Sequence, residues 1–207
     1  KTHTKIALVV RKEKGRLRNY FHIGTGNYNS NTSRFYTDIG LLSTDPDISS
    51  DLIELFNYLS GFSKQKAYQK LLVSPASLRK KFIFLINREI ENVKKGQKGE
   101  IIAKMNSLVD PEIIQLLYLA SQTGVKINLI VRGICCLYPQ RKNLSENIQV
   151  TSIIGHFLEH SRIFWFYNNN NAEVFIGSAD WMRRNLDRRI EAVTPIEAVS
   201  YTHLRAH

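Results

Sequence analysis

The chain has 207 residues, of which 43% are hydrophobic and 23% charged, so it can bury a core in one or two domains and its composition argues against disorder. No apolar run reaches the roughly 18 residues that a membrane-spanning helix needs. The formal net charge of +11 indicates an anionic partner, which is a nucleic acid, an acidic membrane surface or a phosphate-rich substrate.

The first element that the sequence predicts is a β-hairpin. An apolar arm covers 6–10, a charged turn containing glycine covers 12–16, and the return arm at 17–23 ends in Gly-Thr-Gly-Asn. His3 and Lys5 precede the first arm and are two residues apart, so on a strand their side chains point to the same face. The next segment, 35–42, is predicted to be a strand or a loop that lines a site.

Two helices with proline at their start are predicted next. Asp45-Pro46 begins a helix that ends near Ser60, and Ser74-Pro75 begins one that covers 76–95. The polar, basic segment between them indicates a domain boundary, which divides the chain into 1–70 and 71–197. Within the second helix, the basic run 79–81 is more typical of a solvated face than of a binding patch.

A βαβ unit is predicted in the middle of the chain. Strand 101–105, a helix from Asp110-Pro111 to Gly124 and strand 125–131 form a right-handed crossover with a parallel strand pair. Arg132 follows the carboxyl end of the last strand, where open α/β sheets usually bind ligands. We favour a phosphate contact for Arg132 over a helix cap.

A second hairpin follows a strand at 148–154. Its arms are predicted at 161–167 and 173–176, joined by a turn of four asparagines, and the return arm ends in Gly-Ser-Ala-Asp. His160 and Arg162 lie at its start and are again two residues apart. A short turn or helix at 181–186 and a final strand at 188–193 complete the predicted elements.

The two hairpins carry the same motif, His-x-(Lys/Arg) before the first arm and Gly-(Thr/Ser)-x-(Asn/Asp) after the second. One such pattern usually marks surface strand residues, but two copies indicate a duplicated half-site. Two histidines on either side of a phosphorus atom can act as nucleophile and general acid in an in-line displacement. Lys5 and Arg162 would then hold the non-bridging oxygens.

Six blocks of the sequence resemble signature segments of bacterial polyphosphate kinase of the type with two phospholipase-D-like halves. In chain order they are Lys-Thr-His-Thr-Lys at 1–5, Phe-His-Ile-Gly-Thr-Gly-Asn-Tyr at 21–28, Tyr-Thr-Asp-Ile-Gly-Leu-Leu at 36–42, Ile-Ala-Lys-Met-Asn at 102–106, Ile-Val-Arg-Gly-Ile-Cys-Cys at 130–136 and Ser-Ala-Asp-Trp-Met at 178–182. The resemblance extends to about residue 197. It implies an α/β fold with two such halves, the first truncated, and mixed sheets flanked by helices.

The resemblance also implies roles for single residues. His3 would accept the phosphoryl group as a phosphohistidine, and His160 would contact ATP and protonate the departing phosphate. Tyr36 would stack on the adenine ring, although a core tyrosine is the alternative, and Arg132 would contact the ATP phosphates. The implied reaction is the reversible transfer of the terminal phosphate of ATP to polyphosphate. The reaction would use Mg²⁺. The protein ligands of this Mg²⁺ are expected upstream of this chain, and none is expected within it.

Some assignments stay open. Asn27 and Asp180 are candidates to orient the imidazoles, and capping the next turn is equally plausible for them. The phospholipase D pattern places aspartate seven residues after each histidine, where this chain has Val10 and Tyr167, so lipid phosphodiesterase activity is not expected. A phosphodiesterase or nuclease of the same superfamily, or a non-catalytic polyanion-binding module, remain the alternative functions.

The ends and surroundings of the chain complete the expectations. The chain begins in a strand without methionine, so we expect a fragment that is inactive alone. Residues 198–207 resemble the translation of a sequencing adapter rather than native protein.

Adjacent Cys135 and Cys136 favour reduced thiols in the cytoplasm over a disulfide or a metal site. The family resemblance suggests a homo-oligomer at or near the inner membrane, with no nucleic acid partner.

Overall fold

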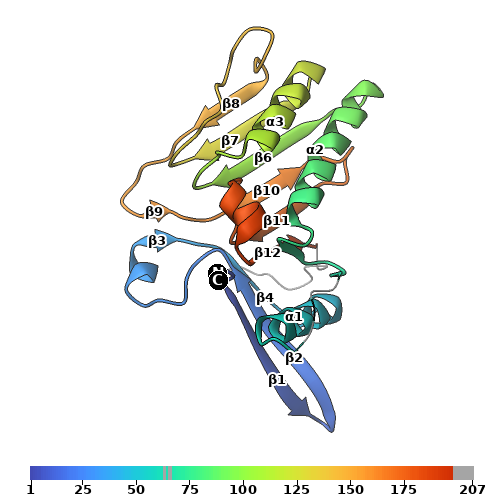
Figure 1. The fold of residues 1–207 in the computed structure, drawn as a ribbon, viewed down its shortest axis with the longest axis vertical. Coiled ribbons are helices and arrows are strands. Elements are labelled where there is room, and N and C mark those ends of the chain that lie inside the picture. The colour runs from blue at the N-terminus through green and yellow to red at the C-terminus, as the bar shows by residue number, and fades with distance from the viewer. Residues whose placement is uncertain (63, 65–66, 198–207) are drawn as a thin grey trace, which may run out of the picture.

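The computed structural model describes residues 1–62, 64 and 67–197. The first half of the chain contains a three-stranded sheet, and the second half contains a seven-stranded sheet (Figure 1). The first sheet has the order β1–β2–β4 and is antiparallel. Its strands are β1 (Ile6–Glu13), β2 (Arg16–Gly24) and β4 (Gly40–Ser43). The predicted first hairpin is confirmed, with a two-residue turn at 14–15 whose positive φ angles of 46° and 78° suit the twist of a hairpin.

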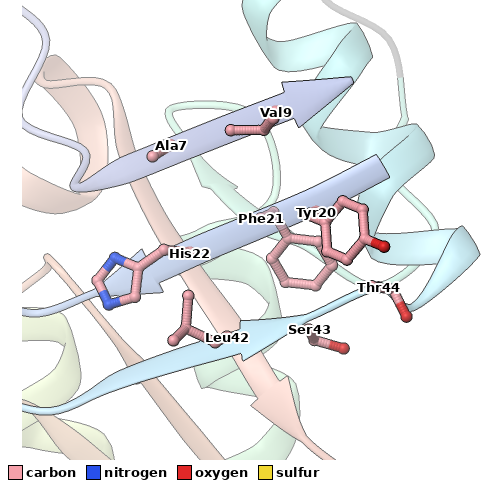
Figure 2. Close-up of a pocket in the computed structure, with 8 residues that line it drawn as sticks. All are labelled: Ala7, Val9, Tyr20, Phe21, His22, Leu42, Ser43 and Thr44. Carbon is pink, nitrogen blue, oxygen red and sulfur yellow. The ribbon is translucent and has the colours of Figure 1, made fainter. Parts of the chain in front are cut away.

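Helix α1 (Pro46–Leu59) packs on one face of this sheet. Asp45 caps it as predicted, because its carboxylate accepts a hydrogen bond from the backbone N–H of Ile48 at 2.9 Å. The core between helix and sheet contains Phe21, Ile23 and Leu52. The sheet also has a pocket of about 370 Å³. Figure 2 shows its lining residues, which are Ala7, Val9, Tyr20, Phe21, His22, Leu42, Ser43 and Thr44.

The second sheet is mixed and has the order β5–β12–β11–β10–β6–β7–β8. The pairs β6–β7 and β7–β8 are parallel, and the other neighbouring pairs, including β10–β6, are antiparallel. Figure 1 shows helices α2 (Leu78–Lys94) and α3 (Pro111–Thr123) side by side on one face. The strands are β5 (Leu72–Ser74), β6 (Glu100–Met105), β7 (Lys126–Val131), β8 (Ile148–Thr151), β10 (Ile163–Phe166), β11 (Glu173–Gly177) and β12 (Glu191–Ile196).

The predicted βαβ unit and the second hairpin are both confirmed. Strands β6 and β7 are parallel and α3 connects them, with Asp110 accepting from the backbone N–H of Ile113 at 3.1 Å and Gly124 in the left-handed conformation at the other end. The asparagine turn joins β10 to β11, and residues 168–170 have positive φ angles of 46°, 48° and 68°. The expected α/β class, with mixed sheets flanked by helices, is therefore confirmed.

Several predictions about the second half differ from the structure, and strand β8, predicted at 148–154, ends at Thr151. Helix α2 begins at Leu78 rather than at 76, because 72–74 form an edge strand that pairs with β12. Arg79 is not on a solvated face: its guanidinium binds Asp110, Glu112 and Asp187. Strand β12 begins three residues later than predicted, because a π-helical turn, η2 (Arg184–Arg188), precedes it.

The two halves are joined by backbone pairing at two places. The short strands β3 (Tyr36–Thr37) and β9 (Leu158–Glu159) are parallel partners, and a 3₁₀ turn, η1 (Thr32–Arg34), precedes β3. Thr2 forms a parallel bridge with Ile190. Figure 1 places β3 and β9 between the two sheets. The predicted domain limits at 70 and 71 stay predictions, and the predicted tail, 198–207, lies outside the described residues.

Candidate active site

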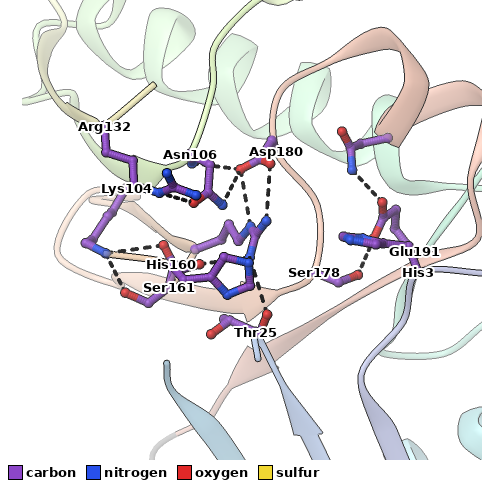
Figure 3. Close-up of polar contacts among 12 residues, drawn as sticks. His3, Thr25, Lys104, Asn106, Arg132, His160, Ser161, Ser178, Asp180 and Glu191 are labelled. Carbon is purple, nitrogen blue, oxygen red and sulfur yellow. Dashed lines mark hydrogen bonds and ion pairs between the residues drawn. The ribbon is translucent and has the colours of Figure 1, made fainter. Parts of the chain in front are cut away.

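His3 lies just before β1 and is held by the second half of the chain. Its backbone N–H donates to the carbonyl of Ile190 at 2.9 Å, and its imidazole Nδ1 lies 2.9 Å from Oε2 of Glu191. Glu191 is fully buried and also accepts hydrogen bonds from Ser178 Oγ and, at 2.5 Å, from Asn185 Nδ2. The carboxylate is therefore fixed by several partners, and it in turn orients the ring of His3 (Figure 3).

His160 lies just before β10 and is held by the first half of the chain. Its backbone N–H donates to the carbonyl of Thr37 at 3.1 Å, and its Nδ1 lies 2.8 Å from Oδ1 of Asp38. Thr25 Oγ1 donates to the same carboxylate oxygen at 2.6 Å. Burial disfavours the charged form of Asp38, but the hydrogen bonds from His160 and Thr25 outweigh it and lower the pKa of that carboxyl. Asp38 therefore stays anionic at neutral pH.

The two histidine environments repeat one pattern with the halves exchanged. In each, the carboxylate directly follows the residue whose carbonyl accepts the backbone N–H of the histidine. In each, the same carboxylate accepts from the hydroxyl of the Gly-(Thr/Ser) motif. The backbone agrees as well, since Thr25 N–H donates to Ile39 O at 3.0 Å and Ser178 N–H donates to Ala192 O at 3.1 Å. Each half thus supplies one histidine and the carboxylate that orients the histidine of the other half.

The predicted cations also occupy matching positions. Lys5 Nζ donates to the carbonyl of His3 at 2.5 Å, and Arg162 Nη1 donates to the carbonyl of His160 at 2.8 Å. Arg162 Nη1 also lies 3.0 Å from Nε2 of His160. Both side chains are buried, and burial lowers the pKa of Lys5 to about 8 although Glu191 partly opposes the shift. Each cation therefore lies against its own histidine.

The two motifs meet at the end of β2. The carbonyl of Lys5 accepts from the backbone N–H of Gly24 at 2.9 Å, and the carbonyl of Thr25 accepts from Arg162 Nη1 at 3.3 Å. Lys5, beside His3, and Arg162, beside His160, are close enough that the positive charge of Arg162 lowers the pKa of Lys5. The structure thus brings the two predicted motifs into one region, and the joint action of both imidazoles on one phosphorus atom stays a prediction.

Asp180 positions a cation rather than an imidazole. Its carboxylate accepts from Arg162 Nε at 3.2 Å and Nη2 at 3.3 Å, and from Asn106 through the backbone N–H at 2.8 Å and Nδ2 at 3.1 Å. Asn106 Oδ1 in turn accepts from Arg132 Nε at 2.5 Å (Figure 3). The carboxylates in contact with the imidazoles are Asp38 and Glu191, whereas Asp180 contacts Arg162, which lies beside His160. The supporting role predicted for Asp180 stays a prediction.

The remaining predicted residues line two pockets. The Tyr36 ring packs against the His160 imidazole, with centroids 4.9 Å apart and planes tilted by 47°. Tyr36, exposed Asn27 and Asp38 line a pocket of about 330 Å³. Arg132 lines a separate pocket of about 270 Å³ with residues of the 153–159 segment. The roles predicted for Tyr36, Asn27 and Arg132 in binding ATP or orienting a histidine stay predictions.

The sequence analysis missed three buried or half-buried site residues: Asp38, Asn106 and Glu191. A signal for two of them was present, because Asp38 lies 13 residues after Thr25 and Glu191 lies 13 residues after Ser178. The repeat therefore has a third motif, an acid at a fixed distance from each hydroxyl. For Asn106 the sequence offers no such spacing, and the fold places it beside Asp180.

The arrangement favours nucleophilic chemistry at the imidazoles. A hydrogen bond from Nδ1–H to a carboxylate leaves Nε2 as the unprotonated nitrogen of a neutral ring. Magnesium does not fit the same residues, because the carboxylates of Asp38, Glu191 and Asp180 are each engaged by hydrogen bonds from neighbouring side chains. In the described part of the chain, no three His, Cys, Asp or Glu side chains are grouped to hold a metal ion.

No helix among the described residues is long and apolar enough to cross a membrane.

Solved structures with a similar fold include a polyphosphate kinase. The crystal structure of polyphosphate kinase from Porphyromonas gingivalis matches with a TM-score of 0.88 and 44% identity, over 94% of this chain and 30% of that chain. Yeast tyrosyl-DNA phosphodiesterase matches with a TM-score of 0.55 and 13% identity, over 94% of this chain and 66% of that chain. At such low identity, the second match shows a shared fold alone.

Sequence relatives agree. Polyphosphate kinase from Prochlorococcus marinus is 70% identical over 197 residues, which are 95% of this chain and 28% of the relative. The protein of that name from Staphylococcus epidermidis is 51% identical over 95% of this chain and 27% of its own length. The chain thus spans about 28% of the curated relatives it matches. Residues 1–65 match the family model for polyphosphate kinase C-terminal domain 1 and residues 71–205 match that for domain 2, so the chain belongs to the polyphosphate kinase family.

Proposed function

We propose that this chain forms the phosphoryl-transfer site of an enzyme that reversibly moves the terminal phosphate of ATP to polyphosphate. The observation that carries the proposal is the crossed arrangement of the two histidines, each oriented through Nδ1 by a carboxylate of the opposite half. Two oriented imidazoles with cations beside them suit phosphoryl transfer, which depends on positioning and charge neutralisation. Family membership supports the same substrates, ATP and polyphosphate.

His3 is the proposed nucleophile. Glu191 accepts the Nδ1 proton, so Nε2 has the lone pair that attacks the terminal phosphorus of ATP. The N–P bond forms as the bond from phosphorus to the leaving oxygen of ADP breaks, and ADP departs with the bonding electrons. Attack by a terminal oxygen of polyphosphate on the phosphohistidine then regenerates His3. Its 25% exposed side chain is accessible enough for these steps.

His160 is the proposed general acid. Its Nε2 now accepts from Arg162, and a ring that is to donate a proton must be protonated at that nitrogen. A phosphate group that attracts Arg162 would release Nε2, so substrate binding and protonation of His160 would be coupled. Tyr36, packed on the same imidazole, and Arg132 are the proposed contacts of the adenine ring and the ATP phosphates. Any Mg²⁺ would have to be bound by residues outside this chain's site.

The test uses a chimera, because this chain covers only part of its relatives. The 197 matching residues replace their equivalents in the Prochlorococcus marinus relative, and the chimera is incubated with γ-labelled ATP. We expect acid-labile, alkali-stable label on His3 that disappears in His3→Ala. Glu146→Gln, a change at an exposed position outside the pockets that Arg132 and Tyr36 line, is the control and should retain the label.

Three results would contradict the proposal. Label that survives in His3→Ala would exclude His3 as the phosphorylated residue. Nicking of plasmid DNA without ATP, lost in His3→Ala, would instead indicate a phosphodiesterase, a reaction that the similar fold of yeast tyrosyl-DNA phosphodiesterase makes worth testing. A folded chimera that binds polyphosphate but is not labelled would indicate a non-catalytic polyphosphate-binding module.

A further inference from the structure

The tip of the β1–β2 hairpin has the most concentrated charge of any short segment in the chain, and the site described above does not use it. Residues 11–18 contain five cations and one acid. Figure 1 shows the hairpin extending away from the region where the two sheets meet. With about 3.3 Å per residue, a strand of eight residues places the tip about 25 Å from the end that carries Lys5.

Three arginines of this tip share one face of the sheet. Arg11 is directly opposite Arg18, and Arg16 is opposite Glu13. Alternation along both strands puts these pairs on the same face as Tyr20, which Figure 2 shows on the open side of the sheet. Like charges directly opposite each other destabilise a hairpin, so the Arg11–Arg18 pair has a cost that the fold itself does not require.

The local acid does not neutralise these arginines. Glu13 lies 3.5 Å from Arg11 Nε and 3.8 Å from Arg18 Nη1, and both arginine side chains remain more than half exposed, at 65% and 57%. Ion pairs with such exposure contribute little. Arg16 and Arg18 also line a surface hollow of about 550 Å³ at the tip. The face therefore offers several guanidinium groups to an extended anion.

The same face is poorly suited to nucleic acid. Single-stranded nucleic acids bind by stacking bases on exposed aromatic rings as well as by charge. Tyr20 is the aromatic residue beside these arginines, and its ring is approached by the guanidinium groups of Arg11 and Arg18, 5.9 Å and 5.4 Å from its centroid. Its hydroxyl donates to Glu13 at 2.9 Å. The ring thus orients the arginines, and a polyanion without bases fits better.

We propose that the face formed by Arg11, Arg16 and Arg18 is an accessory binding site for inorganic polyphosphate, which holds a long chain at a distance from its reacting end. This inference rests on the proposed function and adds a second contact to it. A long chain reaches both the site and the tip, whereas tripolyphosphate is too short to do so. The simpler explanation is that charges at the tip only prevent this edge hairpin from pairing with other strands.

The test measures binding by the 207-residue chain itself. Affinities for long-chain polyphosphate and for tripolyphosphate are measured over a range of salt concentrations for the wild type and the triple variant Arg11→Gln, Arg16→Gln, Arg18→Gln. We expect the variant to bind long chains at least about tenfold more weakly, with the slope of log affinity against log salt reduced by about 2 to 3, while tripolyphosphate binding is unchanged. Glu13→Gln should bind long chains more tightly, since it removes the one acid of the face.

The matched control removes the same charge elsewhere. Lys80 and Lys94 are exposed on α2, and Lys95 is exposed directly after it. Replacement of these three lysines by Gln should change long-chain binding much less than the hairpin variant does. Equal losses in both triple variants would mean that only net charge matters and would overturn the accessory site. So would an unchanged affinity in the hairpin variant, an equal loss for tripolyphosphate, or tighter binding of single-stranded DNA at the tip. If the wild type binds tripolyphosphate and long-chain polyphosphate with equal affinity, the accessory site is disproved while the proposed function stands.

Discussion

His3 and Glu191 are 188 positions apart in the chain, yet the imidazole Nδ1 of one lies 2.9 Å from the carboxylate of the other. The matching pair, His160 and Asp38, is separated by 122 positions and joined at 2.8 Å. Neither half of the chain therefore completes its own histidine site. The backbone pairings at Ile190 and at Thr37, each next to one of these carboxylates, keep the two halves in register.

Replacing Glu191 by Gln should change the tautomer of His3. Gln keeps the size of Glu191 but removes the charge that holds the proton on Nδ1, so nitrogen-detected NMR of the chain should show His3 as a mixture of tautomers. In the chimera, labelling of His3 should fall about 10- to 100-fold. Glu146→Gln, at an exposed position, is the control, and an unchanged His3 spectrum in Glu191→Gln would disprove the positioning role.

Replacing Asp38 by Asn should act on the other histidine. Although Asp38 lies in the first half with His3, its carboxylate contacts His160, so the NMR signals of His160 should change while those of His3 stay the same. The pair of variants tests the crossed arrangement directly. Disturbance of His3 by Asp38→Asn, with His160 unaffected, would mean that each half orients its own histidine.

Much of the fold follows from local sequence signals. Asp45 with Pro46, and Asp110 with Pro111, begin helices at the predicted positions, because the cap and the first turn are local features. The pairing of Glu191 with His3 could not be predicted in the same way, since it depends on how two distant segments meet. Arg79 was misjudged for a similar reason: its partners Asp110 and Asp187 belong to other elements.

The buried pair of Arg162 and Asp180 should be important for stability. Both side chains are nearly inaccessible, and Asp180 also accepts two hydrogen bonds from Asn106. Asp180→Ala leaves the guanidinium buried without its charge partner, so urea unfolding should show a loss of about 3–5 kcal/mol. The double variant Arg162→Met, Asp180→Leu should recover much of that loss. A loss below 1 kcal/mol in Asp180→Ala would show that the pair is not a buried charge pair in solution.

Arg79 should be irreplaceable by lysine. Its Nε and Nη2 contact the two carboxylate oxygens of Asp187 at 2.7 and 2.8 Å, and Nη1 and Nη2 contact Asp110 at 2.9 and 2.6 Å. An ammonium group cannot reproduce this planar geometry, so Arg79→Lys should destabilise the chain by about 1–3 kcal/mol in urea unfolding. Lys80→Arg, on the exposed face next to it, should have almost no effect. Equal stability of Arg79→Lys would mean that charge alone matters at this junction.

Lys5 should make anion binding sensitive to pH just above neutrality. Burial lowers its pKa from 10.5 to about 8, so the charge is present at pH 7 and mostly lost at pH 9. Affinity for tripolyphosphate should fall about tenfold over that range, whereas Lys5→Arg should show no such fall because arginine stays protonated. The effect on stability has the opposite sign. Between pH 8 and 10.5 the unfolded chain binds one proton more than the folded chain, so the wild type should gain stability with rising pH relative to Lys5→Met. Urea unfolding of the two proteins measures this difference. If their stabilities change with pH in parallel, Lys5 titrates normally.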